Sequence, residues 1–148
     1  NGQLRSRGTH ANDKREGPYE SHYDNGQLES EGAYREGKKD GKWCMFHPNG
    51  QLQSSGAFKD GKKTGQWESF HDNGQLRTKE CFVANKQDGP FEEYAADGRL
   101  KVKGGYKDGK KDGLYESYDE NGQLKSKGIF KNGALEGAYE LYENGVLQ

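Results

Sequence analysis

Residues 25–48 read NGQLESEGAYREGKKDGKWCMFHP, and this stretch decides the fold because the whole chain repeats its pattern. Each copy opens with Asn-Gly or Asp-Gly, followed by Leu two residues after the Gly. The copies begin at Asn1, Asn25, Asn49, Asn73, Asp97, Asn121 and Asn144, at steps of 24 residues and a last step of 23. A fixed period of this length is the signature of a repeat array.

The period divides the chain into one array with no other domain. Its units are residues 1–24, 25–48, 49–72, 73–96, 97–120 and 121–143, followed by a stub at 144–148. A seventh unit has just started at the stub, and neither end carries the atypical capping unit that repeat arrays normally need. We therefore expect the chain to be a segment of a longer protein.

A second turn signal lies near the middle of every unit. These dipeptides are Asn12-Asp13, Glu36-Gly37, Asp60-Gly61, Ala84-Asn85, Asp108-Gly109 and Asn132-Gly133. Most of them tolerate the positive φ of a two-residue type I′ hairpin turn, although Glu36 and Ala84 fit less well. Turns every 12 residues or so predict an all-β fold: a repetitive antiparallel β-hairpin meander in a single twisted, elongated sheet of about twelve strands.

The register follows if both turns have two-residue loops. The turn at Asn49-Gly50 then pairs Trp43 with Gly56 and Gly41 with Phe58, while the turn at 60–61 pairs Phe58 with Lys63, Gly56 with Gly65 and Ser54 with Trp67. One face thus carries large rings beside glycines, and an aromatic ring laid across a strand glycine restores buried contact. A second aromatic row falls on the opposite, charged face: Phe46, Phe70, Tyr94, Tyr118 and Tyr142.

The unit G-x-Y/F-x-x-G-K-K-D-G-x-W/Y-x-x-Y/F-x-x-N-G-Q-L resembles the MORN (membrane occupation and recognition nexus) repeat, in particular the bacterial variant in proteins labelled YwqK-family antitoxins. Residues 32–52 and 104–124 match the pattern throughout, and the resemblance covers the whole chain. It implies an antiparallel hairpin array with a binding or scaffolding role; bacterial members are labelled toxin antagonists, and eukaryotic relatives are associated with membranes and protein assembly. The chain departs from the pattern at His10, Glu80, Gln87 and Ala134-Leu135.

The sequence offers no catalytic, metal or cofactor site, so we predict a protein that is not an enzyme. No nucleophile elbow, P-loop, zinc-protease helix or dinucleotide fingerprint is present. His47 and His71 lie two strands apart, about 9.6 Å, too far to share a zinc ion, and we expect both on the polar surface beside the turns. Cys44 and Cys81 lie three strands apart, too far for a disulfide, so we expect free thiols.

Composition narrows the partner class. The chain has 23 Lys and Arg against 24 Asp and Glu, for a net charge of -1. Nucleic-acid binders are usually strongly basic, so we expect no nucleic-acid partner. No apolar run approaches the ~18 residues of a membrane-spanning helix, and no targeting signal is visible; the compartment stays open, with the cytoplasm favoured.

Two sets of residues are candidates for binding a partner. The first is aromatic: Trp43, Trp67, Tyr34, Phe58, Tyr106 and Tyr115. These rings pack on glycine, and Trp and Tyr are also enriched at interface hot spots, so both roles can hold at once. The second is a ladder of lysines along one edge of the sheet, a candidate anion-binding surface: Lys38, Lys39, Lys62, Lys63, Lys110 and Lys111. The alternative is a solvated rim whose charges pair with Asp40, Asp88 and Asp112.

We therefore expect a non-catalytic protein-binding or scaffolding module, with a toxin as one candidate partner. The alternative is a module that docks on anionic membrane lipid through the lysine ladder, which the near-neutral net charge disfavours. Self-association is a third possibility, because the terminal strands of an open sheet leave unpaired edges.

Overall fold

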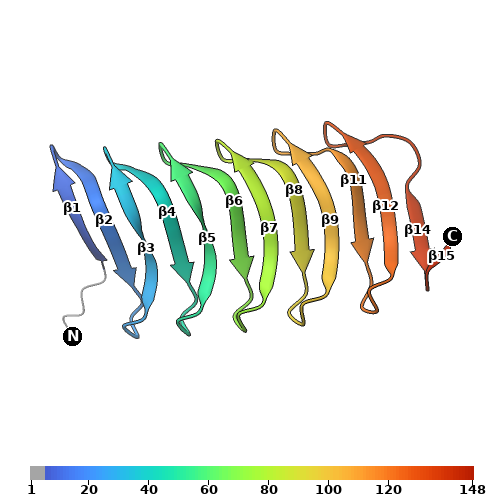
Figure 1. Cartoon of the computed structure of the whole chain (residues 1–148), viewed down its shortest axis with the longest axis horizontal. Helices are drawn as coiled ribbons and strands as arrows, with labels where there is room; N and C mark the ends of the chain where they lie inside the picture. The colour runs from blue at the N-terminus through green and yellow to red at the C-terminus, as the bar shows by residue number, and fades with distance from the viewer. Residues whose placement is uncertain (1–5) are drawn as a thin grey trace.

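The computed structural model describes residues 6–148 and confirms the all-β meander. Fifteen strands form one antiparallel sheet that follows the order of the chain, with β10 and β13 as side pairs of β9 and β12. The hairpins stand side by side, so β1 and β15 lie at opposite ends of the sheet (Figure 1). Among the described residues, no helix is long and apolar enough to cross a membrane.

The first nine strands follow one another along the chain, and each runs antiparallel to the one before it. They are β1 (Ser6–Ala11), β2 (Lys14–His22), β3 (Leu28–Arg35), β4 (Lys38–Phe46), β5 (Leu52–Lys59), β6 (Lys62–Phe70), β7 (Leu76–Val83), β8 (Lys86–Tyr94) and β9 (Leu100–Lys107). The rest are β10 (Lys110–Lys111), β11 (Gly113–Tyr118), β12 (Leu124–Lys131), β13 (Ala134–Leu135), β14 (Glu140–Glu143) and β15 (Val146–Leu147). The count among the described residues exceeds the expected twelve for three reasons: Asp112 separates β10 from β11, residues 136–139 separate β13 from β14, and the C-terminal stub adds β15.

The mid-unit turns have the two-residue geometry that the sequence predicts. The first turn residue has positive φ in all six, including Glu36 at 49° and Ala84 at 47°. Each turn from the second unit on also bonds to the preceding unit, as when Gly61 N donates to Lys39 O at 2.9 Å. The turns therefore stack in a continuous edge along the array.

Five of the Asn-Gly and Asp-Gly turns differ from the prediction, whereas Asn144-Gly145 has the expected two-residue loop. The five loops contain three residues, as when His47 N donates to Gln51 O at 2.8 Å and Gly50 N donates to His47 O at 2.9 Å. Gly50 has a φ of 87°, which fits a type I turn closed by a left-handed residue. A bulge at Gln53 then restores the register, so that Trp43 pairs with Gly56 and Gly41 pairs with Phe58 as expected.

Within the hairpins β3–β4, β5–β6 and β7–β8, a second bulge overturns part of the expected register. Phe58 pairs with Lys63, but Ser54 pairs with Ser69 and not with Trp67. Gly65 does not pair with Gly56, because Gly65, Gln66 and Trp67 together span the single residue Gly56 of β5. Gly65 has a φ of 70°, a conformation that glycine adopts at bulges without strain.

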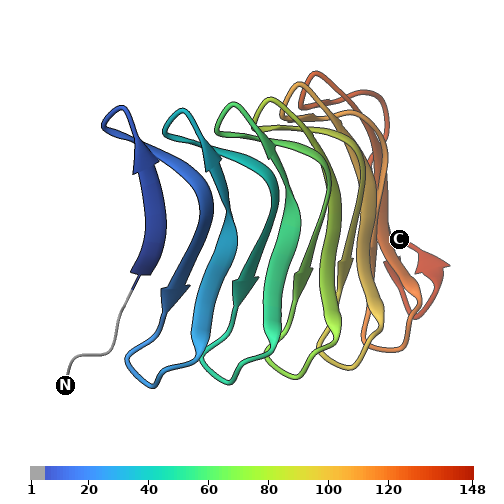
Figure 2. The same ribbon diagram turned by 60° about the vertical axis from the view of Figure 1, so that its left-hand side comes forward.

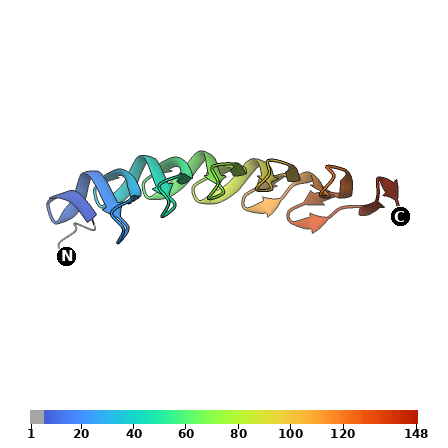
Figure 3. The ribbon, with the colours of Figure 1, turned by 90° about the horizontal axis from the view of Figure 1, so that it is seen from below.

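The bulge lays each Trp ring over a glycine in the other strand of its own hairpin. A Cβ at Gly32 would lie 2.2 Å from the Trp43 ring, and one at Gly56 would lie 2.2 Å from the Trp67 ring. Trp43 and Trp67 are 1% and 2% exposed, so they form the core together with Phe91. The strands bow along their length, which gives the sheet a curved cross-section (Figures 2 and 3). The core is thus a single layer of rings on one face of one sheet.

Candidate interaction surfaces

The face that carries the tryptophans, called the aromatic face below, holds two stacks of rings. The first stack is Tyr19, Tyr34, Trp43, Phe58, Trp67 and Phe82, and the second is Phe91, Tyr106, Tyr115 and Phe130. Successive rings meet edge to face, with centroids 5.1 Å apart for Phe58 and Trp67 and 6.4 Å apart for Trp67 and Phe82. This geometry is the one that aromatic quadrupoles prefer.

The two stacks are separated at Glu80. A glycine stands at the equivalent place in the preceding units, but here Glu80 faces Trp67 on one side and Phe91 on the other. Gln87 stands where the two preceding units have Lys39 and Lys63. It donates from Nε2 to Glu80 Oε2 at 2.8 Å. Two departures from the repeat pattern thus form one polar pair, and no ring contact within residues 6–148 joins Phe82 to Phe91.

The candidate aromatic residues divide by burial. Trp43 and Trp67 are almost fully buried, and their Nε1 atoms donate to Ala33 O at 3.0 Å and Ala57 O at 3.2 Å. The other four are half-buried: Tyr34, Phe58, Tyr106 and Tyr115. In this conformation the tryptophans support the surface while the half-buried rings form it. Partner binding by these residues stays a prediction.

Cations lie over the rings of the aromatic face. The Lys39 Nζ atom is 4.5 Å from the centroid of the Trp43 ring and 5.1 Å from that of Phe58. Lys63 is 4.6 Å from Trp67, and Lys111 is 4.2 Å from Tyr115. These distances are within the ~6 Å range of cation–π attraction. The second lysine of each Lys-Lys pair is therefore half of a structural contact, a role that sequence reasoning missed.

The first lysine of each pair points the other way, because adjacent strand residues alternate between faces. Lys38, Lys62 and Lys110 are exposed on the opposite face and pair across the turn with Arg35, Lys59 and Lys107. They belong to a longer set, called the basic row below: Lys14, Arg35, Lys38, Lys59, Lys62, Lys86, Lys107, Lys110 and Lys131. The six predicted anion-binding lysines thus share one edge but divide between two faces.

The basic row is not neutralised as expected. Among residues 6–148, no ion pair within 4.0 Å joins its members to Asp40, Asp88 or Asp112, so that part of the interpretation is wrong. Asp88 instead accepts a hydrogen bond from the backbone N–H of Asp108 at 3.3 Å. The aspartate side chain caps the next turn and leaves the lysines to solvent.

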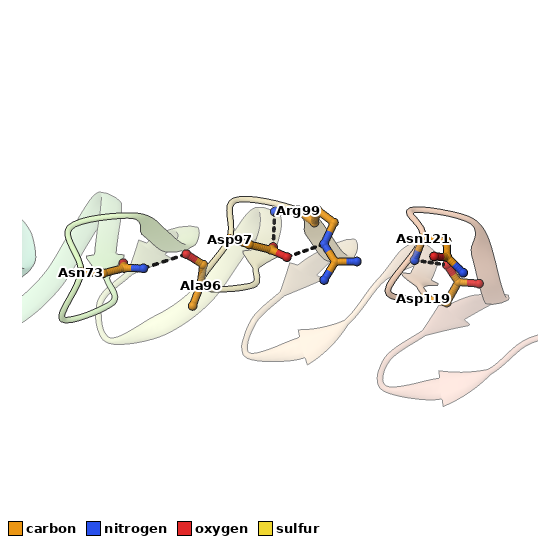
Figure 4. A network of polar contacts seen from close by, with 6 residues as sticks. All are labelled: Asn73, Ala96, Asp97, Arg99, Asp119 and Asn121. Carbon is orange, nitrogen blue, oxygen red and sulfur yellow. Dashed lines mark hydrogen bonds and ion pairs between the residues drawn. The ribbon is translucent and has the colours of Figure 1, made fainter.

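The Asn-Gly edge is held together by side chains that reach forward to the next turn of the same edge. Asn25, Asn49 and Asn73 donate from Nδ2 to the carbonyls of Pro48, Asp72 and Ala96 at 2.8 to 2.9 Å. The series stops at Asp97, which has no donor and bonds Arg99 in its own turn (Figure 4).

His47 and His71 belong to the same edge. Their Nε2 atoms bond to the carbonyls of Phe70 and Tyr94, each at 2.9 Å. The expectation of a polar surface beside the turns missed this link between units. Among the described residues, no group of three or more His, Cys, Asp or Glu side chains is placed to hold a metal ion.

The second aromatic row lies on the opposite face, as predicted. Tyr94 and Tyr118 each donate to the carboxylate two residues earlier on the same strand, Glu92 and Glu116. The hydrogen bond to Glu92 raises the pKa of Tyr94, and burial raises the pKa of Tyr118. Cys44 and Cys81 are free thiols on this face, and burial raises the pKa of Cys44.

Comparison with known protein families assigns the repeat to a family. The family described as MORN repeat variant matches residues 15–36, 39–60, 63–84 and 111–132. The copy expected between 84 and 111, which contains Gln87, is not matched. No curated protein matches the chain. Repeats of this family are generally non-enzymatic modules that bind proteins or membranes. Because the matches cover more than half of the 148 residues, the chain belongs to the MORN repeat variant family.

Proposed function

We propose that this chain is a non-catalytic protein-binding module whose aromatic face contacts the partner. The observation that carries the proposal is the pair of ring stacks, in which half-buried rings such as Phe58 and Tyr106 alternate with cations such as Lys39 and Lys111. Aromatic rings are enriched in the centre of protein interfaces, where a few of them supply most of the binding energy.

The tryptophans support this surface and do not form it. Trp67 is 2% exposed, and its indole N–H already bonds to Ala57 O. A side chain so held is pre-organised, and a pre-organised surface loses less conformational entropy when it binds. The half-buried rings above the tryptophans are therefore the better candidates for direct contact.

A toxin is the partner class that we favour. The resemblance of the repeat to the bacterial variant in proteins labelled YwqK-family antitoxins supports this choice. An extended sheet also suits a protein that covers the active site of another. The test is to identify the genes beside that of this chain and to titrate the chain calorimetrically with any toxin that they encode. A complex with a Kd in the micromolar range or below is expected, and no detectable heat at ten times that concentration contradicts the toxin assignment.

Two variants locate the contact surface. Phe58→Ser removes a half-buried ring from the aromatic face, and Leu114→Ser is the control, because Leu114 is 50% exposed on the opposite face. We expect Phe58→Ser to weaken binding at least tenfold and Leu114→Ser to change it less than twofold, with circular dichroism confirming that both variants fold. Equal losses for the two variants would exclude the aromatic face.

Anionic-lipid docking is the second candidate, favoured by the basic row. Like charges directly opposite each other on paired strands are unfavourable, yet Arg35 faces Lys38, Lys59 faces Lys62, and Lys107 faces Lys110. Co-sedimentation with vesicles containing phosphatidylserine tests it: binding should fall steeply with salt and with Lys38→Glu and Lys62→Glu. Lys39→Glu, on the aromatic face, should have little effect. Absence of sedimentation at low salt rejects this candidate.

A further inference from the structure

A hollow of about 430 Å³ opens on the basic row between three successive mid-unit turns. It is lined by Lys38, Lys59, Lys62, Thr64, Val83 and Ala84. Asp60, at the tip of the middle turn, completes the lining. Every unit contributes an equivalent edge, so the composition of this hollow can be compared with that of its neighbours.

Two repeats earlier, the equivalent hollow is lined by Ala11, Asn12, Lys14, Glu16, Arg35 and Glu36, with a volume of about 410 Å³. There the carboxylate of Glu16 accepts a hydrogen bond from the backbone N–H of Glu36 at 2.7 Å. One repeat after the hollow at Thr64, the carboxylate of Asp88 accepts from the N–H of Asp108 in the same way. At both positions an anionic side chain of the protein itself engages the N–H of the next turn. Asp40 and Asp112 stand at the same position in two further units, without such a bond among residues 6–148.

Thr64 stands where these units have Glu16 and Asp88. Thr carries no negative charge, and no hydrogen bond among residues 6–148 engages its hydroxyl. The turn N–H that the missing carboxylate would reach belongs to Ala84, which likewise has no hydrogen-bond acceptor in the described part of the chain. The hollow therefore keeps the turn N–H donor but lacks, at position 64, the carboxylate that Glu16, Asp40, Asp88 and Asp112 supply in the other units.

The charge of the hollow defines the anion that fits. Three lysines and one aspartate give a net charge of two positive units, and Lys59 lies directly opposite Lys62. An anion between them would relieve the repulsion of this like-charge pair. A phosphate monoester has a charge of about −1.5 to −2 at pH 7 and three strong acceptor oxygens, whereas a carboxylate has a single charge. Phosphate thus matches both the charge and the number of donors.

We propose that this hollow binds the phosphate group of a phosphorylated side chain on a protein partner. The proposal rests on the protein-binding function above, and it adds a second contact on the opposite face of the sheet. A phosphorylated side chain suits the hollow because it delivers one phosphate into one recess, and Val83 and Ala84 offer apolar contact to its carbon atoms. Lys38, Lys59 and Lys62 pair with the phosphate oxygens, and Ala84 N–H takes the role that Asp108 N–H has beside Asp88.

The test is a titration of the isotopically labelled chain by NMR with a glycine-flanked phosphoserine peptide. Inorganic phosphate and the unphosphorylated peptide are run in parallel. We expect saturable shifts at the amides of residues 62–64 and 84 with the phosphopeptide, weaker shifts with inorganic phosphate, and none with the unphosphorylated peptide.

Two substitutions make the test specific. Thr64→Asp restores the residue type found at Asp40, Asp88 and Asp112, so the variant should fold, and we expect it to weaken phosphopeptide binding at least tenfold. Asp88→Thr removes the carboxylate from the equivalent position one repeat later, where Lys62, Lys86 and Lys107 stand in place of Lys38, Lys62 and Val83. We expect Asp88→Thr to create a second site with shifts at Asp108.

The outcomes separate this proposal from the preceding one. Unchanged binding by Thr64→Asp overturns it, as does binding to vesicles of phosphatidic acid without binding to the phosphopeptide. Phe58→Ser, on the aromatic face, should bind the phosphopeptide like the unmodified chain. A failure of the aromatic face to bind a toxin would therefore leave the phosphate result standing, and the reverse also holds.

Discussion

The turns at Asn73 and Asp97 occupy equivalent places in neighbouring units, yet only the first is bonded by its side chain to the next turn of the same edge. Asn73 reaches Ala96 O at 2.8 Å, while Asp97 bonds the backbone N–H and the guanidinium of Arg99 within its own turn (Figure 4). The ring stack on the aromatic face is interrupted one unit earlier, at Glu80. In a repeat array, stability is close to a sum of units and nearest-neighbour contacts, so these substitutions weaken coupling locally.

The contrast between the halves extends to packing. The first half contains both tryptophans, whereas the second contains most of the exposed large apolar side chains: Leu114, Ile129, Leu135, Tyr139, Leu141, Val146 and Leu147. We infer that the first half provides most of the rigidity of the array. The predictions below test this difference, beginning with its core.

The largest expected effect follows removal of a core ring from each half. Trp67→Ala should reduce the free energy of unfolding by about 3–5 kcal/mol, because it empties a site that is 2% exposed. Tyr115→Ala, at the equivalent place in the second stack, should cost less, because Tyr115 is only half-buried and its side chain makes no bond like that of the Trp67 indole. Guanidinium denaturation followed by circular dichroism measures both.

The control for this pair is Leu141→Ala, since Leu141 is 53% exposed and should change stability little. If Tyr115→Ala costs as much as Trp67→Ala, the two halves are equally well packed and the contrast drawn above is wrong.

Restoring the interrupted stack should show coupling between Glu80 and Phe91. Glu80→Gly alone removes the bond to Gln87 and leaves a gap, and Phe91→Trp alone places a larger ring against the Glu80 side chain. Each single change should destabilise by about 1 kcal/mol, and the double variant should recover most of the loss, because it recreates the glycine-tryptophan contact of Gly56 and Trp67. A double-mutant cycle by denaturation measures the coupling, and additive effects would show that Glu80 alone does not set the ring size at 91.

The comparison of the two turns is tested by exchanging their side chains, with Asn73→Asp and Asp97→Asn. Asn73→Asp removes the donor to Ala96 O and should cost about 1 kcal/mol, a typical net contribution of one hydrogen bond. Asp97→Asn gains a donor toward the next turn but loses the contacts of the carboxylate with Arg99, so the net change should be smaller. Thermal denaturation of the two variants and of their combination tests the ranking. A larger loss for Asp97→Asn would mean that local contacts dominate these turns.

The sequence alone was sufficient for the meander, because Asn-Gly and the mid-unit dipeptides mark every reversal of the chain. It also placed Trp43 opposite Gly56, but through two deviations that cancel: a three-residue loop at 48–50 and a bulge at Gln53. It could not place Trp67, because Gly65 and Gly56 look alike in sequence, while only Gly65 has positive φ and forms a bulge.

The details of the candidate surfaces could not be predicted from the sequence, because they also depend on the bulges and turns. Alternation along a strand would have assigned Lys62 and Lys63 to opposite faces, but the contact of Lys63 with the Trp67 ring depends on the bulge. The hollow at Thr64 needed the structure, because a Thr in place of an Asp becomes informative only when the neighbouring carboxylates are seen to accept turn N–H groups.

The smallest expected effect is a difference in acid sensitivity between the two turns. The backbone N–H of Arg99 stabilises the carboxylate of Asp97 and holds its pKa below its ordinary value of 3.8. A carboxyl whose pKa is lower in the folded state adds stability above its unfolded-state pKa, and that stability is lost as the pH falls through the folded-state pKa. The amide of Gln75 makes the equivalent bond to Asn73 Oδ1, a group that does not titrate. In an NMR titration from pH 6 to pH 2, the Arg99 amide should therefore shift with a midpoint below 3.8 while the Gln75 amide follows no such transition. Asp97→Asn should abolish the Arg99 transition, and a transition that survives in this variant would assign it to another carboxyl and remove the acid-sensitive difference between the turns.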